Sequence, residues 1–336
     1  MNRTTSEYQI EAVAKTYHHW ITGLTLAIIS KKGASVAERF VFRLFRKQHL
    51  EKFIGGLEKL GLQDTPAAIA CAKYHYFSNQ LGGVSVEYLE ESPKKAWIRY
   101  PPPRWIWSGT AICAIPANVN RAMLYGWHAY NGVTLNNPYL GFVCTGTTVE
   151  GAPGLEGFYL EYDKPLAENE RLTFRFDLEC PPIDKTTLPA LDSDIWPKER
   201  KAKAYRNYAM AYMRTALPIV LDILGPKEGH KIGCLTAKQI GMQMYRELSQ
   251  IFDIRDDSKM AFADFMSRFL TLSGDSILRN ENEQLTRKKW RLFPGNYHPF
   301  ATSCQISLFD GLLAAHNRFL ALRANIRDGT TEFTLV

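Results

Sequence analysis

The feature that most constrains the fold of this chain is an internal repeat with a nearly constant offset. Glycines, apolar residues and a helix-starting aspartate recur after 192 residues: Gly33 and Gly225, Leu62 and Ile254, Asp64 and Asp256, Phe77 and Phe269, Gly82 and Gly274. Shifts of 194 and 191 residues align Lys94-Lys95 with Lys288-Lys289 and Cys113 with Cys304. A repeat of this kind predicts two copies of one structural unit.

Each copy begins with helical periodicity and continues with alternating, strand-like segments. In the first copy we expect helices over 7–31, 34–61, 64–77 and 116–131, and strands over 84–89, 96–100, 140–147, 157–162 and 171–178. In the second we expect helices over 198–224, 229–252, 256–272 and 308–322, and strands over 276–280, 289–293 and 332–336. The fold class predicted is therefore α+β, with a helical subdomain followed by a small antiparallel sheet in each of two tandem repeats.

A proline-rich stretch without periodicity separates the two copies. Residues 181–197 contain Pro181, Pro182, Pro189 and Pro197, a composition typical of linkers. We therefore expect a first repeat over residues 1–180 and a second over 198–336.

Composition excludes several classes of protein. Of 336 residues 46% are hydrophobic and 22% charged, which favours a buried core over disorder. The net charge is +7, but its basic clusters are scattered and accompany no nucleic-acid motif, so we expect no nucleic acid partner. The apolar run Leu24–Ile29 is too short to span a bilayer, so we expect no membrane and a cytoplasmic location. The six cysteines lack the spacing of a disulfide framework. The sequence neither predicts nor excludes a homodimer.

The second copy carries residues that suggest a family. From Phe265 through Trp290-Arg291-Leu292-Phe293, Cys304, Leu312-Leu313-Ala314-Ala315-His316 and Glu332-Phe333-Thr334-Leu335, it resembles the L-2-amino-thiazoline-4-carboxylic acid hydrolase family. In outline it is also similar to 4-vinyl reductase domains. The resemblance implies a small-molecule enzyme or a ligand-binding module. Members of the hydrolase family often carry further cysteines near the final strand, and residues 331–336 have none.

Arginines, aromatic residues and one histidine concentrate between residues 99 and 130. Aromatic rings can bury a flat ligand, and an arginine can hold a carboxylate through paired hydrogen bonds. The substrate-binding candidates are Arg99, Arg104, Trp105, Trp107, Tyr125, His75 and the loop residue His298. The alternative is that the tryptophans pack the core between repeats.

His128 is the predicted proton carrier, because a histidine near neutral pKa can exchange a proton at cellular pH. Tyr130 is a further catalytic candidate, and Cys113 is a candidate nucleophile that needs a base or a cation nearby. The alternatives are a half-buried histidine at a helix end and a merely buried thiol.

No motif requires a cofactor, so the cofactor is unknown. His18, His19 and His75 lie on predicted helices, but no metal-ligand spacing is present and we expect no metal site. The glycine-rich residues 146–157 lack the Lys-Ser/Thr of a phosphate-binding loop; they form either a lid or a plain hairpin connection.

The function predicted is that of a hydrolase or related acid–base enzyme acting on a cyclic or aromatic carboxylate. The main alternative is a non-catalytic sensor or carrier that uses the same ligand pocket. A third is a duplicated scaffold that binds a protein partner through an exposed apolar patch.

Overall fold

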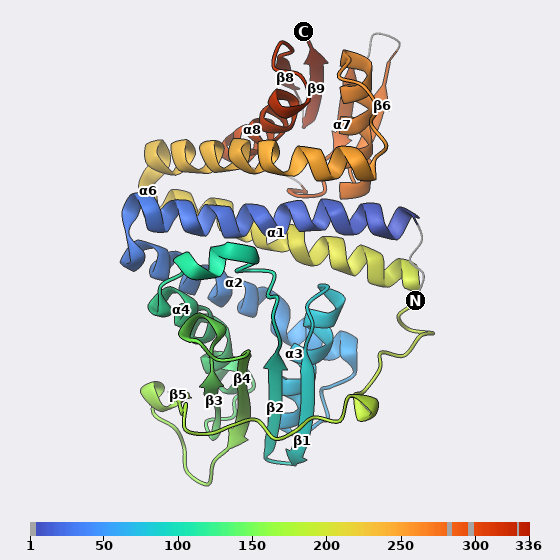
Figure 1. Ribbon diagram of the computed structural model, residues 1–336. Helices are drawn as coiled ribbons and strands as arrows, with labels where there is room; N and C mark the ends of the chain where they lie inside the picture. The colour runs from blue at the N-terminus through green and yellow to red at the C-terminus, as the bar shows by residue number, and fades with distance from the viewer. Residues whose placement is uncertain (1–4, 281–283, 295–298, 328) are drawn as a thin grey trace. The chain divides into compact units, whose positions relative to one another are not determined.

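The chain repeats one order of elements twice (Figure 1). Each time, a run of helices is followed by a small sheet, and in the sequence a further helix lies between the strands of that sheet. The computed structural model describes residues 5–280, 284–294, 299–327 and 329–336. The helices are α1 (Thr5–Lys32), α2 (Ala34–Leu60), α3 (Ala67–Leu81), α4 (Ala117–Trp127), α5 (Asn131–Thr134), α6 (Lys198–Ile251), α7 (Lys259–Ser273) and α8 (Pro299–His316). The fold class is α+β, as predicted.

The strands form two sheets with the same order of their first four members. The first sheet runs β1-β2-β4-β3-β5 and the second β6-β7-β9-β8. Their bounds are β1 (Glu87–Ser92), β2 (Lys95–Tyr100), β3 (Leu140–Gly146), β4 (Leu155–Glu161), β5 (Leu172–Phe174), β6 (Ser276–Arg279), β7 (Leu285–Lys289), β8 (Leu322–Arg327) and β9 (Thr330–Leu335). Every pairing is antiparallel except that of β3 with β5.

Backbone conformation repeats at the predicted offset. Gly33 (φ 88°, ψ 167°) separates α1 from α2, and Gly225 (φ 77°, ψ 163°) interrupts α6 in the same conformation. Gly61 and Asp253 both have positive φ at a helix end, where their amides bond back to Glu58 and Gln250. These matches support the repeat, and its origin by duplication stays a prediction.

Two compact units make up the described chain. Unit 1 joins the residues up to Ala27 to Tyr205–Val336, and unit 2 comprises Ile28–Ala204. The predicted domains differ from these units chiefly in the place of the first helix, most of which belongs to unit 1. Tyr17 shows why: its ring lies 6.1 Å from that of Phe269, and its hydroxyl lies 3.2 Å from Ser273 Oγ.

Unit 2 is built in layers around its sheet. Helix α3 covers one face, packing against β1, β2 and β4, and α2 packs against both α3 and α4. The opposite face carries Trp97, Val143 and Phe158, which are covered by Leu178 and Cys180 from the extended chain after β5 (Figure 1). The chain can follow β5 across this face because Phe142 N–H donates to the Arg171 carbonyl, fixing β5 beside β3.

Several predicted elements differ from the structure at their ends. The helix expected over 308–322 begins at Pro299 and ends at His316, and the strand expected over 289–293 is β7 at Leu285–Lys289. Strand β8 was not predicted, although Leu322, Ala324 and Ile326 alternate with polar residues, because the helix expected over 308–322 reached its first residue. Residues 181–197 contain neither an α-helix nor a β-strand.

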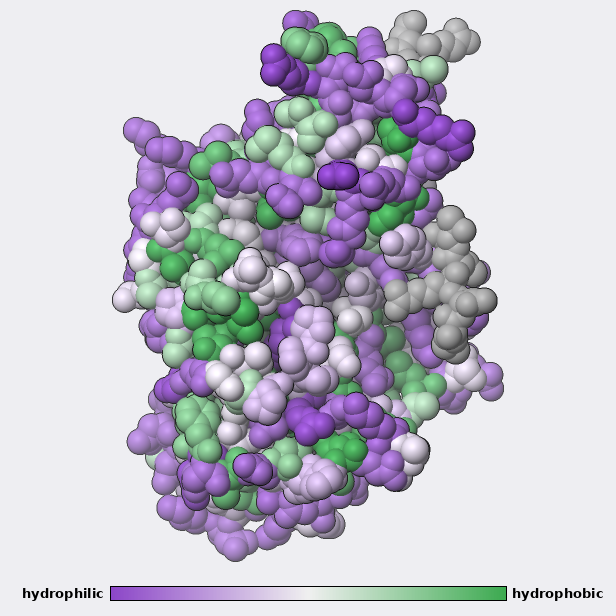
Figure 2. All heavy atoms as spheres, in the orientation of Figure 1, coloured by the Kyte–Doolittle hydropathy of each residue, from purple (hydrophilic) through white to green (hydrophobic). Residues whose placement is uncertain are grey.

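The surface in Figure 2 shows hydrophobic side chains in separate areas among hydrophilic ones, as on most proteins. No helix in the described part of the chain is long and apolar enough to cross a membrane.

Candidate functional site

Three histidines lie together in the interior of unit 2. His49 lies on α2, His75 lies on α3, and His128 lies on the one-turn 3-10 helix His128–Tyr130 that follows α4. The rings of His75 and His128 stack with their centroids 4.3 Å apart. We call these three residues the histidine layer.

The histidine layer is neutral at physiological pH. Burial lowers the pKa of His49 and of His75 to about 3, and it lowers the pKa of His128 well below its usual value. The positive charge of Arg104 acts in the same direction on His75 and His128. A protonated imidazole is therefore disfavoured here both by loss of hydration and by a nearby cation.

Hydrogen bonds hold two of the three rings. The Tyr100 hydroxyl lies 3.2 Å from His75 Nδ1, and Arg46 Nη1 lies 2.7 Å from His49 Nδ1. Asn131 Nδ2 donates to the Tyr159 hydroxyl at 2.8 Å and lies 3.5 Å from His75 Nε2.

His128 differs from its neighbours because neither ring nitrogen has a hydrogen-bond partner among the described residues. Its side chain is only 6% exposed, and Phe142 packs against it with ring centroids 4.6 Å apart. A general acid or base must reach the proton it transfers, directly or through one water. In this conformation His128 therefore faces no proton donor or acceptor in the part of the chain that the structure describes.

Arg104, one of the two arginines predicted to bind substrate, also lies inside unit 2. It is 9% exposed, its guanidinium carbon lies 4.7 Å above the Tyr100 ring, and Nη2 lies 3.7 Å from Met123 Sδ. The structure thus brings Arg104, His75 and His128 together, but in the interior of the unit.

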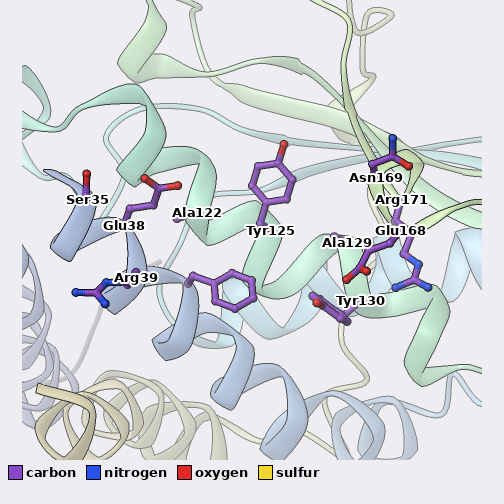
Figure 3. A pocket seen from close by; sticks show the side chains of 11 residues that line it. Ser35, Glu38, Arg39, Ala122, Tyr125, Ala129, Tyr130, Glu168, Asn169 and Arg171 are labelled. Atoms are coloured by element: carbon purple, nitrogen blue, oxygen red, sulfur yellow. The ribbon is translucent and has the colours of Figure 1, made fainter. Parts of the chain in front are cut away.

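An open groove lies on the surface of the same unit (Figure 3). It has a volume of about 840 Å³, within the usual range for small-molecule sites. Helix α2, helix α4 with the turn that follows it, and the segment before β5 form its walls. The lining residues are Ser35, Glu38, Arg39, Phe42, Ala122, Tyr125, Ala129, Tyr130, Glu168, Asn169 and Arg171.

The groove combines charges of both signs with aromatic rings. Arg39 and Glu38 lie toward one end, and Tyr130, Glu168 and Arg171 toward the other, with Tyr125 between them (Figure 3). Within the part of the chain that the structure describes, neither guanidinium forms an ion pair. Arginine binds carboxylates through paired hydrogen bonds, and carboxylates bind basic nitrogens, so the lining suits a ligand that carries both groups.

Arg46 connects the groove to the histidine layer. Its guanidinium carbon lies 3.9 Å above the ring of Tyr130, and Nη1 contacts His49. Gly126 makes this layering possible, because a Cβ there would lie 2.6 Å from the Phe42 carbonyl oxygen and force α4 away from α2.

The structure separates the remaining predicted residues from the groove. Arg99 forms an ion pair with Glu87 across β1 and β2, and Trp107 is buried with its Nε1 bonded to Asn120 Oδ1 at 2.9 Å. Trp105 is half-buried in the loop after β2. His298 lies outside the described residues. Of the predicted residues, only Tyr125 and Tyr130 line the groove.

The predicted match between Cys113 and Cys304 is wrong. Cys113 is exposed on the 3-10 helix Gly109–Ala114, whereas Cys304 is buried in α8. The sequence match arises because the loops before α4 and α8 differ in length, so one offset cannot align both a loop and the helix after it.

Sequence reasoning missed the charged residues of the groove. In the sequence Arg39 resembles part of a solvated basic face, and Glu168 and Arg171 precede a strand. The only local signal is the Glu38-Arg39 pair one turn after Ser35 at the start of a helix. No group of three His, Cys, Asp or Glu side chains in the described residues is arranged to hold a metal ion.

Comparison with known proteins returned no match to a family model, to a curated protein or to a solved structure. The resemblance to the thiazoline-carboxylic acid hydrolases therefore stays an expectation.

Proposed function

We propose that unit 2 binds a small cyclic or aromatic carboxylate that also carries a basic nitrogen. The observation that carries the proposal is the convergence of Arg39 and Arg171, two tyrosines and two glutamates on one groove. The arginine at one end of the groove would bind the carboxylate, the glutamate at the other end the basic nitrogen, and the tyrosine rings the apolar faces. The proposed ligand class is the one predicted from residues 99–130, and the proposed binding site is the groove.

The first form of the proposal is a sensor or carrier without proton chemistry. Its support is the position of the histidine layer, which lies behind Arg46 and Tyr130 and not in the groove. A ligand that displaces the Tyr130 ring would move Arg46 and hence its bond to His49, so binding can be transmitted to the interior of the unit.

The second form is a hydrolase in which groove residues replace His128. Glu168 and Tyr130 lie at the same end of the groove as Arg171 (Figure 3). A carboxylate can activate water and a phenol can protonate a leaving group, so this end has the components of acid–base catalysis. Turnover of a cyclic amide or thiazoline that is lost in Glu168→Gln would favour this form over the carrier.

Binding can be tested by calorimetry with three probes: 2-aminothiazoline-4-carboxylate, proline and pyridine-2-carboxylate. The matched carboxamides are the ligand controls, because they keep the ring and lack the charge. We expect one of the two variants Arg39→Ala and Arg171→Ala, the one at the carboxylate's end of the groove, to weaken carboxylate binding at least about tenfold, the size of one charge-assisted hydrogen bond.

Lys59→Ala is the matched control variant. It removes one positive charge from the last turn of α2, outside the groove, and should leave affinity unchanged. Equal binding of acids and carboxamides, or no binding of any probe, would contradict the proposal.

A further inference from the structure

Helices α6 and α8 pack unusually closely in unit 1. Gly241 of α6 and Gly311 of α8 lie at the contact, and a Cβ at either position would overlap the backbone of the opposite helix. Gly233, two turns earlier in α6, continues this approach: a Cβ there would lie 2.9 Å from Cys304 Sγ. The glycines therefore allow residues of the two helices to approach more closely than larger side chains would.

This approach brings two thiols together. Cys234, the residue after Gly233, has its Sγ 3.8 Å from Cys304 Sγ, although 70 residues separate them in the chain. Cys304 is buried and Cys234 is partly exposed. His230, one helical turn before Cys234, places Nε2 3.7 Å from its Sγ.

The surroundings make the two thiols chemically different. A hydrogen bond from Cys304 lowers the pKa of Cys234 to about 6, with smaller effects of the same sign from Ser307 and His230. Burial and the charge of Asp310 on α8 oppose this decrease. The pKa of Cys304 is raised by the same hydrogen bond and by burial. Cys234, which is partly exposed and lies beside His230, is therefore the more acidic of the two thiols.

We propose that Cys234 and Cys304 form a redox site that reduces a hydroperoxide and closes to a disulfide. The Cys234 thiolate attacks the outer oxygen of the hydroperoxide, the O–O bond breaks, and the leaving alkoxide or hydroxide takes a proton from solvent and departs as an alcohol or water, giving a Cys234 sulfenic acid. The Cys304 thiol then attacks the Cys234 sulfur, an S–S bond forms, and the sulfenic oxygen leaves as water. The two thiols lose two electrons and the peroxide gains them.

The other cysteines lack this arrangement. Burial raises the pKa of Cys144 and of Cys180 to about 12, and it raises that of Cys71 further. Cys113 is exposed, and no other thiol lies near it among the described residues. Cys113 is therefore the matched internal control, since it is accessible to peroxide and has no partner with which to form an intramolecular disulfide.

The test is peptide mapping without reductant after one equivalent of hydrogen peroxide is added to the full chain. We expect a single new peptide that links Cys234 to Cys304, with Cys113 still reduced. Because the pKa of the attacking thiol is lowered, its rate should level off at a lower pH than that of free cysteine, whose pKa is about 8.5.

Three variants make the test decisive. Cys304→Ser should stop the reaction at a sulfenic acid on Cys234, which dimedone captures, and Cys113→Ser should leave disulfide yield unchanged. Gly233→Ala keeps both thiols but moves Cys304, so the yield should fall severalfold. Oxidation of Cys113 ahead of Cys234, or a Cys234 that stays reduced, would overturn the proposal. None of these outcomes depends on ligand binding in the groove.

Discussion

Neutral histidines at the centre of unit 2 give its stability a specific dependence on pH. His49, His75 and His128 have pKa values below the unfolded value of about 6.5, so the folded state binds fewer protons than the unfolded state below that pH. Their contribution is fully present above pH 6.5 and is lost as the pH falls toward the folded values. Each of these histidines lowers the free energy of unfolding by about 1.4 kcal/mol for every pH unit between 6.5 and its folded pKa.

His128→Phe should therefore make the protein more resistant to acid. Phenylalanine fits among Phe142 and the stacked rings and has no proton to gain. The free energy of unfolding, measured with urea at pH 7.0 and pH 5.0, should fall by about 2 kcal/mol less in the variant than in the parent chain. His230→Gln, at an exposed position, should retain the full pH dependence. A variant with the parent's dependence would show that His128 is protonated in the folded state.

The sequence predicted those groove residues whose neighbours in the chain already suggest a pocket. Tyr125 and Tyr130 stand out in the sequence because aromatic residues at the end of a helix, next to a histidine, suggest a pocket wall. Arg39 and Arg171 carry no such signal, because 132 residues separate them and their presence on one groove depends on the pairing of β5 with β3. The burial of His128 was also hidden, since its neighbours come from α3, β3 and β4.

At the scale of elements, glycine decides how closely helices pack. Two glycines in unit 2 have opposite surroundings. Gly126 of α4 faces the backbone of α2, whereas a Cβ added at Gly55 of α2 would meet no heavy atom within 4 Å. The same substitution should therefore have opposite effects at the two sites.

Gly126→Ala should destabilise the protein by about 1 to 3 kcal/mol, the usual cost of overpacking a close contact. Gly55→Ala should stabilise it by about 0.5 to 1 kcal/mol, because alanine restricts the unfolded chain and favours helix. Chemical denaturation of both variants measures the difference. Similar values for the two would mean that α2 and α4 can separate without cost.

Elements with a strong local pattern were predicted well. Alternation on both sides of a polar turn indicated the hairpin of β1 and β2, and Gly225-Pro226 indicated the interruption of α6. Strand β8 has an alternating pattern in Leu322, Ala324 and Ile326, but it is short and Ile326 is exposed, so the strand is defined mainly by its pairing with β9.

At the scale of the whole molecule, the two units have separate cores and different titrating groups. Unit 1 contains His18 and His19, whose pKa values are lowered by burial, and Asp275, whose pKa burial raises to about 6. Asp275 therefore adds to the free energy of unfolding below pH 4, and this stabilisation is lost as the pH rises through 6. On acidification Asp275 therefore offsets part of the loss from His18 and His19, an offset that unit 2 lacks for its three histidines.

We expect calorimetry to resolve two thermal transitions whose midpoints separate further between pH 7 and pH 5. Gly126→Ala should lower only the transition of unit 2, and Gly311→Ala only that of unit 1, which identifies each. Asp275→Asn should remove the offset in unit 1. A single transition lowered equally by both glycine variants would show that the units unfold together.

Helix α1 has a consequence for the order in which the chain acquires structure. Residues 28–204 can complete their own core while synthesis continues, but Tyr17 finds Phe269 and Ser273 only after about 250 more residues have been added. At ribosomal speeds of about 5 to 20 residues per second, that interval is roughly 10 to 50 s. During it the apolar face of the first helix has no native partner, so this helix depends on protection until residues 269–273 have been synthesised.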